Sequence, residues 1–339
     1  MTRARPKVVM TDYDFPSLAL IRDRVEAINA EFVATQCKTP EDVIELCREA
    51  DAVITEYYNP LDRRIINQMK HCQAIVRTGI GYDTVDLEAA TDHGIYVVNI
   101  PAYSLDEVSD HALTLLLASA RKLPLLNDSV KRGSWDFKIA QPTLRLRGQT
   151  LGIVGYGRIG QKLQPKAAAL GLHVIAYDPY NDPHAPPKNV PSVSFEALLS
   201  ESDYISIHAP LTPETRSLFD EAAFRQMKPT AYLINTARGP IVQLESLYQA
   251  LKQGWISGAG MDVLETEPID PSHPILKFAN FIVTPHCAWY SEGAKEELLR
   301  TVAEEVVRTL QGQRPLSVVN PAVESHARAA SPEWRLANA

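Results

Sequence analysis

The stretch Leu151-Gly152-Ile153-Val154-Gly155-Tyr156-Gly157-Arg158-Ile159-Gly160 decides the fold of this chain. A β-branched run leads into glycines spaced as G-x-G-x-x-G, and a helical pattern follows to Leu170. Glycines in such a turn let a pyrophosphate approach the backbone N–H groups at a helix N-terminus. The next strand pattern ends in Asp178, whose carboxylate suits a ribose 2′-hydroxyl and repels a 2′-phosphate. The pattern predicts a site for NAD(H) rather than NADP(H), with an ordinary strand-to-helix turn as the plainer alternative.

Strand and helix patterns alternate on both sides of this turn. Strands are expected at 8–11, 32–34, 52–55, 74–77, 96–99, 150–154, 173–178, 204–208, 231–235, 258–263 and 281–284. Long helices are expected at 104–123 and 291–310, and Pro165 should kink the helix that follows the glycine turn. The alternation predicts an α/β protein with two doubly wound parallel-sheet domains. Residues 124–148 are expected to be loop-rich, and the chain beyond Pro321 to pack loosely or be disordered.

Composition excludes several other classes of protein. A length of 339 residues fits two domains, and a net charge of −7 gives no electrostatic footprint for nucleic acid. The sequence has neither an apolar run long enough for a membrane span nor a secretory signal pattern. Four cysteines (Cys37, Cys47, Cys72 and Cys287) lack the paired spacing of a disulfide framework or a zinc site. We therefore expect a cytoplasmic protein that binds neither metal, membrane nor nucleic acid.

Three later contexts each carry one reactive side chain: Arg238 in Asn235-Thr236-Ala237-Arg238-Gly239, Glu267 before Pro268, and His286 after Thr284-Pro285. An arginine grips a carboxylate with two parallel hydrogen bonds, and a histidine delivers a proton near neutral pH. A nearby carboxylate orients the imidazole. Taken singly, these residues have plainer interpretations as a surface arginine, a solvated glutamate and a buried structural histidine. Together with a nicotinamide site, they predict hydride transfer to a 2-oxo acid.

Further motifs occur in order along the chain, at Arg77–Asp83, Tyr177–Tyr180, Pro210–Thr215 and Met261–Val263. With the glycine turn and the Arg238 segment, they make residues from about 50 to about 320 resemble the NAD-dependent D-isomer-specific 2-hydroxyacid dehydrogenases. The resemblance implies a Rossmann cofactor domain, 101–290, inserted into a flavodoxin-like substrate domain, 1–100 and 291–325. It also implies hinges at the two long helices, a C-terminal tail at 326–339 and a homodimer formed through the cofactor domain.

The resemblance also implies roles for individual residues. Arg238 would bind substrate, and His286, paired with Glu267, would be the acid/base. The implied cofactor contacts are Val108, Gly155, Gly157, Arg158, Ile159, Gly160, Asp178, Ala209, Pro210, Thr215, Thr236, Ala237 and Asp262, the last at the nicotinamide carboxamide. Residues 285–292 are most similar to the C-terminal-binding-protein branch. That branch implies substrate contacts at Arg77 and Trp289, and the family resemblance implies that backbone amides near Gly79 and Ile80 add to carboxylate binding.

Two functions of different classes follow from these features. The first is an enzyme that interconverts a 2-oxo acid and a D-2-hydroxy acid with NAD(H). The second is an NAD(H)-sensing, corepressor-like module that binds protein partners and has weak dehydrogenase activity. A formate- or phosphite-type dehydrogenase is disfavoured because formate needs no carbonyl protonation. Arg77, Trp289, Tyr290 and the Tyr57-Tyr58 pair would suit a substrate substituent that is larger than methyl or anionic.

Overall fold

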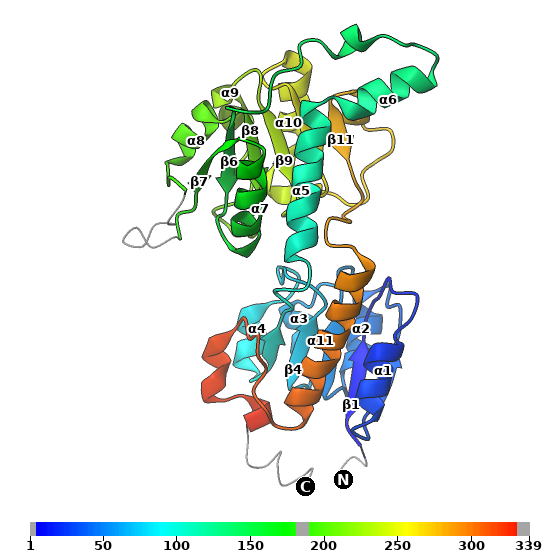
Figure 1. Cartoon of the computed structure of the whole chain (residues 1–339). Helices are drawn as coiled ribbons and strands as arrows, with labels where there is room; N and C mark the ends of the chain where they lie inside the picture. Colours follow the sequence, from blue (N-terminus) through cyan, green and yellow to red (C-terminus); the bar gives the residue numbers. More distant parts are fainter. Residues whose placement is uncertain (1–4, 181–189, 331–339) are drawn as a thin grey trace. The chain divides into compact units, whose positions relative to one another are not determined.

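The computed structural model describes residues 5–180 and 190–330 and divides the chain into two compact units. The first unit comprises the chain up to Tyr103 together with the chain from Ser291 onward. The inserted unit is Ser104–Tyr290 (Figure 1). The first boundary between the units falls after Tyr103, just before the first long helix begins.

The first unit is built on a five-stranded parallel sheet of order β2-β1-β3-β4-β5, the flavodoxin-like order. Its strands are β1 Lys7–Met10, β2 Glu31–Ala34, β3 Ala52–Thr55, β4 Ala74–Arg77 and β5 Tyr96–Val98. Its α-helices are α1 Ala19–Glu26, α2 Pro40–Cys47, α3 Arg63–Ile66, α4 Leu87–Asp92 and α11 Glu292–Leu310. Every residue of β3 and β4 is buried, as expected for central strands with helices on both faces.

The inserted unit holds a six-stranded parallel sheet of order β11-β10-β9-β8-β6-β7. Its strands are β6 Thr150–Val154, β7 His173–Tyr177, β8 Tyr204–Ile207, β9 Tyr232–Asn235, β10 Gly258–Met261 and β11 Phe281–Val283. A single parallel bridge, Ala176 to Ser192, lies at the outer edge of β7 and stands where a Rossmann fold has its third strand. The strand order reverses at β6, so the glycine turn after β6 lies at the topological switch point, where such sheets bind ligands.

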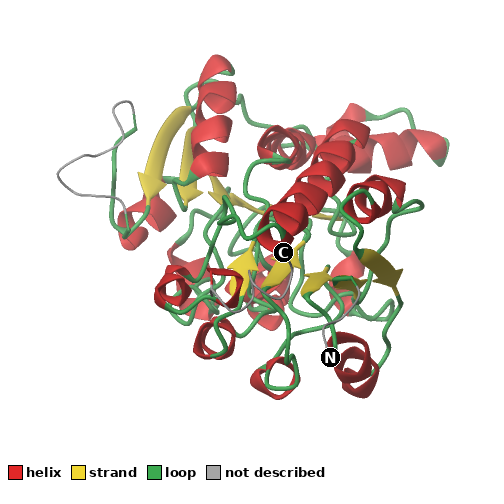
Figure 2. Cartoon of the chain, turned by 90° about the horizontal axis from the view of Figure 1, so that it is seen from below, coloured by secondary structure: helices red, strands yellow, loops and turns green. Residues whose placement is uncertain are grey.

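The α-helices of the inserted unit are α5 Leu105–Ala120, α6 Leu123–Lys131, α7 Arg158–Ala169, α8 Phe195–Glu201, α9 Glu221–Gln226 and α10 Leu244–Gln253. In both views helices lie beside the strands of each sheet (Figures 1 and 2). Among the described residues, no helix has the length and apolar character needed to cross a membrane.

The expectation of loop-rich structure over 124–148 is wrong for its first part, because α6 occupies Leu123–Lys131. Pro124 lies in the first turn of α6, where its missing N–H removes no intrahelical hydrogen bond. Lys122, at φ 49°, separates α6 from α5. Pro165 lies inside α7, on the exposed side of the helix. The backbone carbonyl that loses its hydrogen-bond donor to this proline can therefore face water.

The expectation of loose packing beyond Pro321 is wrong as far as residue 330. Short 3-10 turns form at Pro321–Ser325 and Arg328–Ala330, and Val323 and Ala327 are buried. The Arg328 Nη1 donates to the carbonyls of Met69 and Cys72, at 2.7 and 3.1 Å. The small apolar side chains and this arginine thus dock the segment on the first unit. The rest of the expected tail, 331–339, lies outside the described residues.

Candidate active site

The three glycines of the turn after β6 meet three different surroundings. Gly155 has φ +87°, and a Cβ there would lie 2.5 Å from the backbone nitrogen of Ala209. A Cβ on Gly160 would lie 2.7 Å from the Gly155 carbonyl oxygen, so this glycine permits α7 to pack on β6. A Cβ on Gly157, the N-cap of α7, would meet no atom within 4 Å. Gly157 therefore borders open space at a helix N-terminus, where a pyrophosphate binds in dinucleotide folds.

Asp178 holds this turn in place from the end of β7. Its carboxylate accepts hydrogen bonds from the backbone N–H groups of Tyr156, at 2.8 Å, and Tyr180, at 3.0 Å. Carboxylate oxygens have further lone pairs, so Asp178 retains the capacity to accept from a ribose hydroxyl. Arg158 is exposed at the first position of α7, and Ile159 beside it is partly buried.

Two buried polar atoms at neighbouring strand ends have no hydrogen-bond partner among the described residues. They are the Thr236 Oγ1, after β9, and the His208 Nδ1, after β8. Burial lowers the pKa of His208 to about 4, and its Nε2 lies 2.9 Å from the Ser206 Oγ. An unsatisfied buried polar atom is destabilising, whereas a polar ligand that reaches it removes the penalty. These atoms and the space beside Gly157 fit a dinucleotide.

The other residues expected at the cofactor also lie in the inserted unit. Ala209 and Pro210 follow β8, and the Thr215 Oγ1 donates to the Pro210 carbonyl at 2.7 Å, which closes the 210–215 turn. Ala237 follows Thr236 at the end of β9, and Val108 is buried in α5.

His286 and Glu267 are brought into direct contact, with 2.7 Å between the His286 Nδ1 and the Glu267 Oε2. The other oxygen of Glu267 accepts from the Leu264 N–H at 2.8 Å, which fixes the carboxylate. The side chains of His286 and Glu267 are 28% and 18% exposed, so the pair is partly buried but accessible. Because Nδ1 faces Glu267, the opposite ring nitrogen, Nε2, is the atom suited to proton transfer with a bound substrate.

Arg238 lies in the loop after β9, next to the loop that carries Glu267. A Cβ on Gly239 would lie 1.9 Å from the Leu264 carbonyl oxygen, so only glycine allows these two loops to touch. The buried Asn235 fixes the turn: its Nδ2 donates to the Arg238 carbonyl and its Oδ1 accepts from the Ala237 N–H, both at 2.9 Å. Sequence reasoning missed this role of Asn235, although a polar residue at the end of a buried strand is a usable signal.

Asp262, at the end of β10, holds the segment that carries His286. The Asp262 carboxylate is buried and accepts from the N–H groups of Cys287, at 3.0 Å, and Ala288, at 2.8 Å. Its backbone carbonyl accepts from the His286 N–H at 2.9 Å. His286 has φ 52°, a left-handed conformation that destabilises a non-glycine residue by roughly 1–2 kcal/mol. Asp262 therefore organises the histidine segment, a role that its predicted nicotinamide contact did not include.

The expected substrate contacts are divided between the units. Arg77 is buried at the end of β4, and its guanidinium lies across Gly79, where a Cβ would be 1.6 Å from Nη1. The Gly79 N–H donates to the Arg77 carbonyl at 2.9 Å, and the Ile80 carbonyl accepts from the Asn99 Nδ2 at 2.7 Å. Trp289 belongs to the inserted unit and packs edge-on against Tyr290, with 5.5 Å between ring centroids.

A buried carboxylate also organises the carboxyl edge of the first unit. Asp12, after β1, accepts from the N–H groups of Tyr57 and Tyr58, both at 2.8 Å. Burial raises the pKa of the neighbouring Glu56 to about 7, although a hydrogen bond from the backbone N–H of Asp14 acts in the opposite direction. Only the tyrosine pair of this cluster was anticipated from the sequence.

Comparison with known proteins places these features in a family. A model described as "D-isomer specific 2-hydroxyacid dehydrogenase, NAD binding domain" matches residues 113–288. The chain is 38% identical over 287 residues to a glyoxylate reductase of Korarchaeum cryptofilum, covering 83% of this chain and 86% of that protein. It is 36% identical to a D-3-phosphoglycerate dehydrogenase of Archaeoglobus fulgidus, over 89% of this chain and 58% of that protein. The structure is similar to that of a D-lactate dehydrogenase from Aquifex aeolicus complexed with NAD and lactic acid, with a TM-score of 0.81, 27% identity, and coverage of 96% and 99% of the two chains.

Proposed function

Because the chain belongs to the D-isomer-specific 2-hydroxyacid dehydrogenase family, whose members are NAD-dependent oxidoreductases, we propose that Arg238, Glu267 and His286 catalyse the interconversion of a 2-oxo acid and a D-2-hydroxy acid. The observation that carries the proposal is the 2.7 Å contact between the His286 Nδ1 and the Glu267 Oε2, beside the Arg238 loop. This contact lies in the same unit as a glycine turn that fits NAD(H).

Each of the three side chains has a separate task in the reducing direction. The Arg238 guanidinium would bind the substrate carboxylate with two parallel hydrogen bonds. NADH bound at the glycine turn would supply the hydride, and would leave as NAD⁺. The His286 Nε2 would give its proton to the carbonyl oxygen as the hydride reaches C2, so that the C=O becomes CH–OH. Glu267 accepts from Nδ1–H and holds the ring in this orientation. In the oxidising direction, His286 takes the same proton back.

The cofactor contacts proposed for this reaction follow the glycine turn. Gly157 and Arg158 would lie at the pyrophosphate, and Asp178 at the ribose, where its charge disfavours NADP(H). Thr236, at the end of β9, offers a buried hydroxyl to the cofactor. Asp262, the residue expected at the carboxamide, accepts several protein hydrogen bonds as well.

A panel of 2-oxo acids tests the proposed function and ranks its substrates. We expect NADH-dependent reduction of one or more of pyruvate, glyoxylate, hydroxypyruvate, phenylpyruvate and 4-methylthio-2-oxobutyrate, with a D-configured product and a weaker response to NADPH. Phosphonate analogues test for an anionic substituent. Binding of NADH without reduction of any of these acids would contradict the proposal and favour the partner-binding alternative.

The finer assignment to the C-terminal-binding-protein-like branch rests on residues 285–292 and proposes Arg77 and Trp289 as substrate contacts. Backbone amides near Gly79 and Ile80 are proposed to bind the substrate carboxylate, as in the wider family. The branch assignment implies that acids with a large or anionic substituent react faster than glyoxylate. The curated relatives named above are a glyoxylate reductase and a phosphoglycerate dehydrogenase, and the panel separates these possibilities directly.

We also propose a cytoplasmic homodimer that forms through α6 and the segment after it. This arm exposes Leu123 at 59%, Trp135 at 91% and Phe137 at 71%, which is unusual for large apolar side chains unless another surface covers them. The four unpaired cysteines fit a reducing compartment.

Sedimentation analysis tests the dimer. Wild type is expected to sediment as a dimer, and the Trp135→Ser/Phe137→Ser variant as a monomer, because its apolar contact is lost. Tyr180→Ser is the matched control, since Tyr180 is an equally exposed aromatic residue outside the arm. A monomeric wild type, or a dimer that survives the double substitution, would refute this interface.

A further inference from the structure

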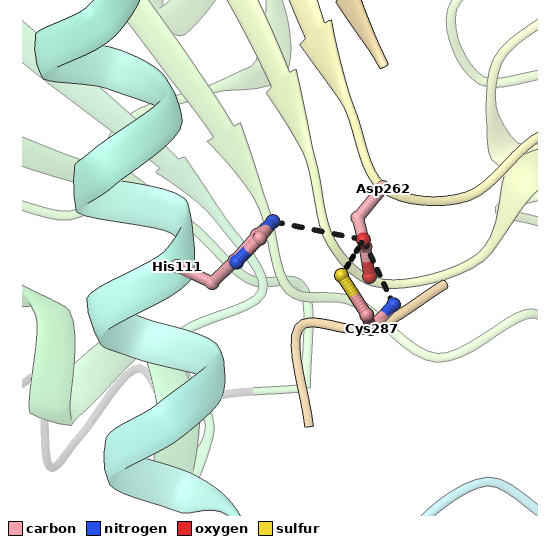
Figure 3. A group of neighbouring side chains, drawn as sticks. All are labelled: His111, Asp262 and Cys287. Carbon is pink, nitrogen blue, oxygen red and sulfur yellow. Dashed lines mark hydrogen bonds and ion pairs between the residues drawn. The ribbon is translucent and has the colours of Figure 1, made fainter. Parts of the chain in front are cut away.

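Three side chains lie close together next to His286 in the sequence or the fold, as Figure 3 shows: His111 from α5, Asp262 from the end of β10, and Cys287. One ligand atom from each lies within 4.8 Å of the others, a spacing compatible with a metal ion. The hydrogen bonds favour another use of the cluster. The Asp262 Oδ1 already accepts from the Cys287 N–H and from the Thr284 hydroxyl, at 2.6 Å. Burial, together with the adjacent Asp262 carboxylate, raises the pKa of the Cys287 thiol, which favours the protonated form over the thiolate a metal needs.

The direction of each hydrogen bond can be assigned from chemistry. A carboxylate has no hydrogen to donate, so the Thr284 hydroxyl must donate to the Asp262 Oδ1. Its hydrogen is then used, and the Thr284 oxygen must accept from the His111 Nε2, 3.0 Å away. His111 therefore carries its proton on Nε2. That nitrogen also lies 3.6 Å from the Asp262 Oδ1. The result is a chain of donors from His111 through Thr284 to Asp262.

This series of hydrogen bonds ends at the His286 segment. Asp262 receives the N–H groups of His286, Cys287 and Ala288, three consecutive residues, through its backbone and side-chain oxygens. His286 adopts a left-handed φ of 52°, which persists only when its surroundings hold it. Hydrogen bonds in series polarise and strengthen one another in a buried setting. His111 is 173 residues from Thr284 in sequence and belongs to a helix packed on β9 and β10.

We propose that His111 is a positioning residue for hydride transfer: by donating to Thr284, which in turn donates to Asp262, it holds residues 286–288 and thereby aims the His286 imidazole. The kinetic consequence of this inference rests on the proposed function. The ordering of residues 286–288 by His111 can be measured without any substrate. In this role His111 does not need to exchange a proton with the substrate.

The experiment compares His111→Leu, which removes the donor, with His111→Gln, whose side-chain amide can replace Nε2–H. Thr114→Val, an exposed substitution one turn along the same helix, is the matched control for α5. In cofactor-free protein, amide hydrogen exchange over residues 284–290 should be faster in His111→Leu and near wild type in the other two variants. With the best acid from the panel, kcat of His111→Leu should fall about tenfold, as expected for one lost hydrogen bond. Its NADH affinity and its KM should change less than about twofold.

A larger deuterium isotope effect with 4-deuterated NADH is expected in His111→Leu, because a wrongly oriented His286 imidazole slows the chemical step. Thr284→Val should behave like His111→Leu. The double variant should show little further change, since both substitutions interrupt the same series of hydrogen bonds. Unchanged exchange over 284–290 in His111→Leu would overturn the proposal, as would equal losses in His111→Gln and His111→Leu. Zinc titration in which one equivalent binds wild type but not His111→Leu would show a metal site instead. Failure of wild type to reduce any acid concerns the proposed function, and the exchange result stands apart from it.

Discussion

Replacing His286 with glutamine should lower kcat about a thousandfold and leave the affinity for NADH within about twofold of wild type. Glutamine keeps a polar group of similar size but cannot carry and release a proton near neutral pH. The hydride would then reach a carbonyl whose oxygen receives no proton, so the barrier rises, while the side chain of His286 is not among the proposed cofactor contacts. Stopped-flow reduction of the best 2-oxo acid and NADH fluorescence titration measure the two quantities separately.

Arg238 provides an informative companion to the histidine variant. Arg238→Gln should abolish turnover with NADH bound as in wild type, because the substrate carboxylate loses its partner. Arg238→Lys keeps the charge but not the two parallel hydrogen bonds, and should raise KM with a smaller loss in kcat. Purified, folded His286→Gln or Arg238→Gln enzyme with near-normal turnover would rule out these roles.

Replacing Gly157 with alanine should weaken NADH binding about a hundredfold, or about 2.7 kcal/mol, without destabilising the protein. The new Cβ meets no protein atom within 4 Å, and Gly157 has φ −75°, which alanine adopts without strain. The methyl group instead occupies the space that the pyrophosphate needs beside the backbone of the helix N-terminus.

Gly160→Ala is the matched contrast, because its Cβ would lie 2.7 Å from the Gly155 carbonyl oxygen. Overpacking of this kind typically destabilises a protein by about 1–3 kcal/mol, so its thermal midpoint should fall. Calorimetric unfolding and NADH titration of both variants make the comparison. If Gly157→Ala binds NADH like wild type, the cofactor does not approach this turn as proposed.

Much of the fold follows from local patterns. Parallel strands buried on both faces, such as β3 and β4, appear in the sequence as short continuous apolar runs. The glycine turn was recognisable because glycines at this spacing, between a strand and a helix, permit a tight turn, close approach of a pyrophosphate and close packing of the helix on the strand. The helix boundaries were less accessible. Pro124 marks the start of α6 rather than its absence, since proline is tolerated in a first turn and excluded only further along.

Arg238, Glu267 and His286 could be selected as candidate catalytic residues from the sequence, because each follows a strand whose end lies at the ligand-binding edge. The tertiary structure alone decided what holds them. Gly239 touches Leu264, Asn235 spans the Arg238 turn, and His111 reaches Asp262 through Thr284. Contacts of this kind join residues from separate elements and leave no periodicity or spacing in the chain. Sequence therefore determined which chemistry this protein carries, whereas long-range hydrogen bonds and close backbone contacts, visible only in three dimensions, determined how His286 is held.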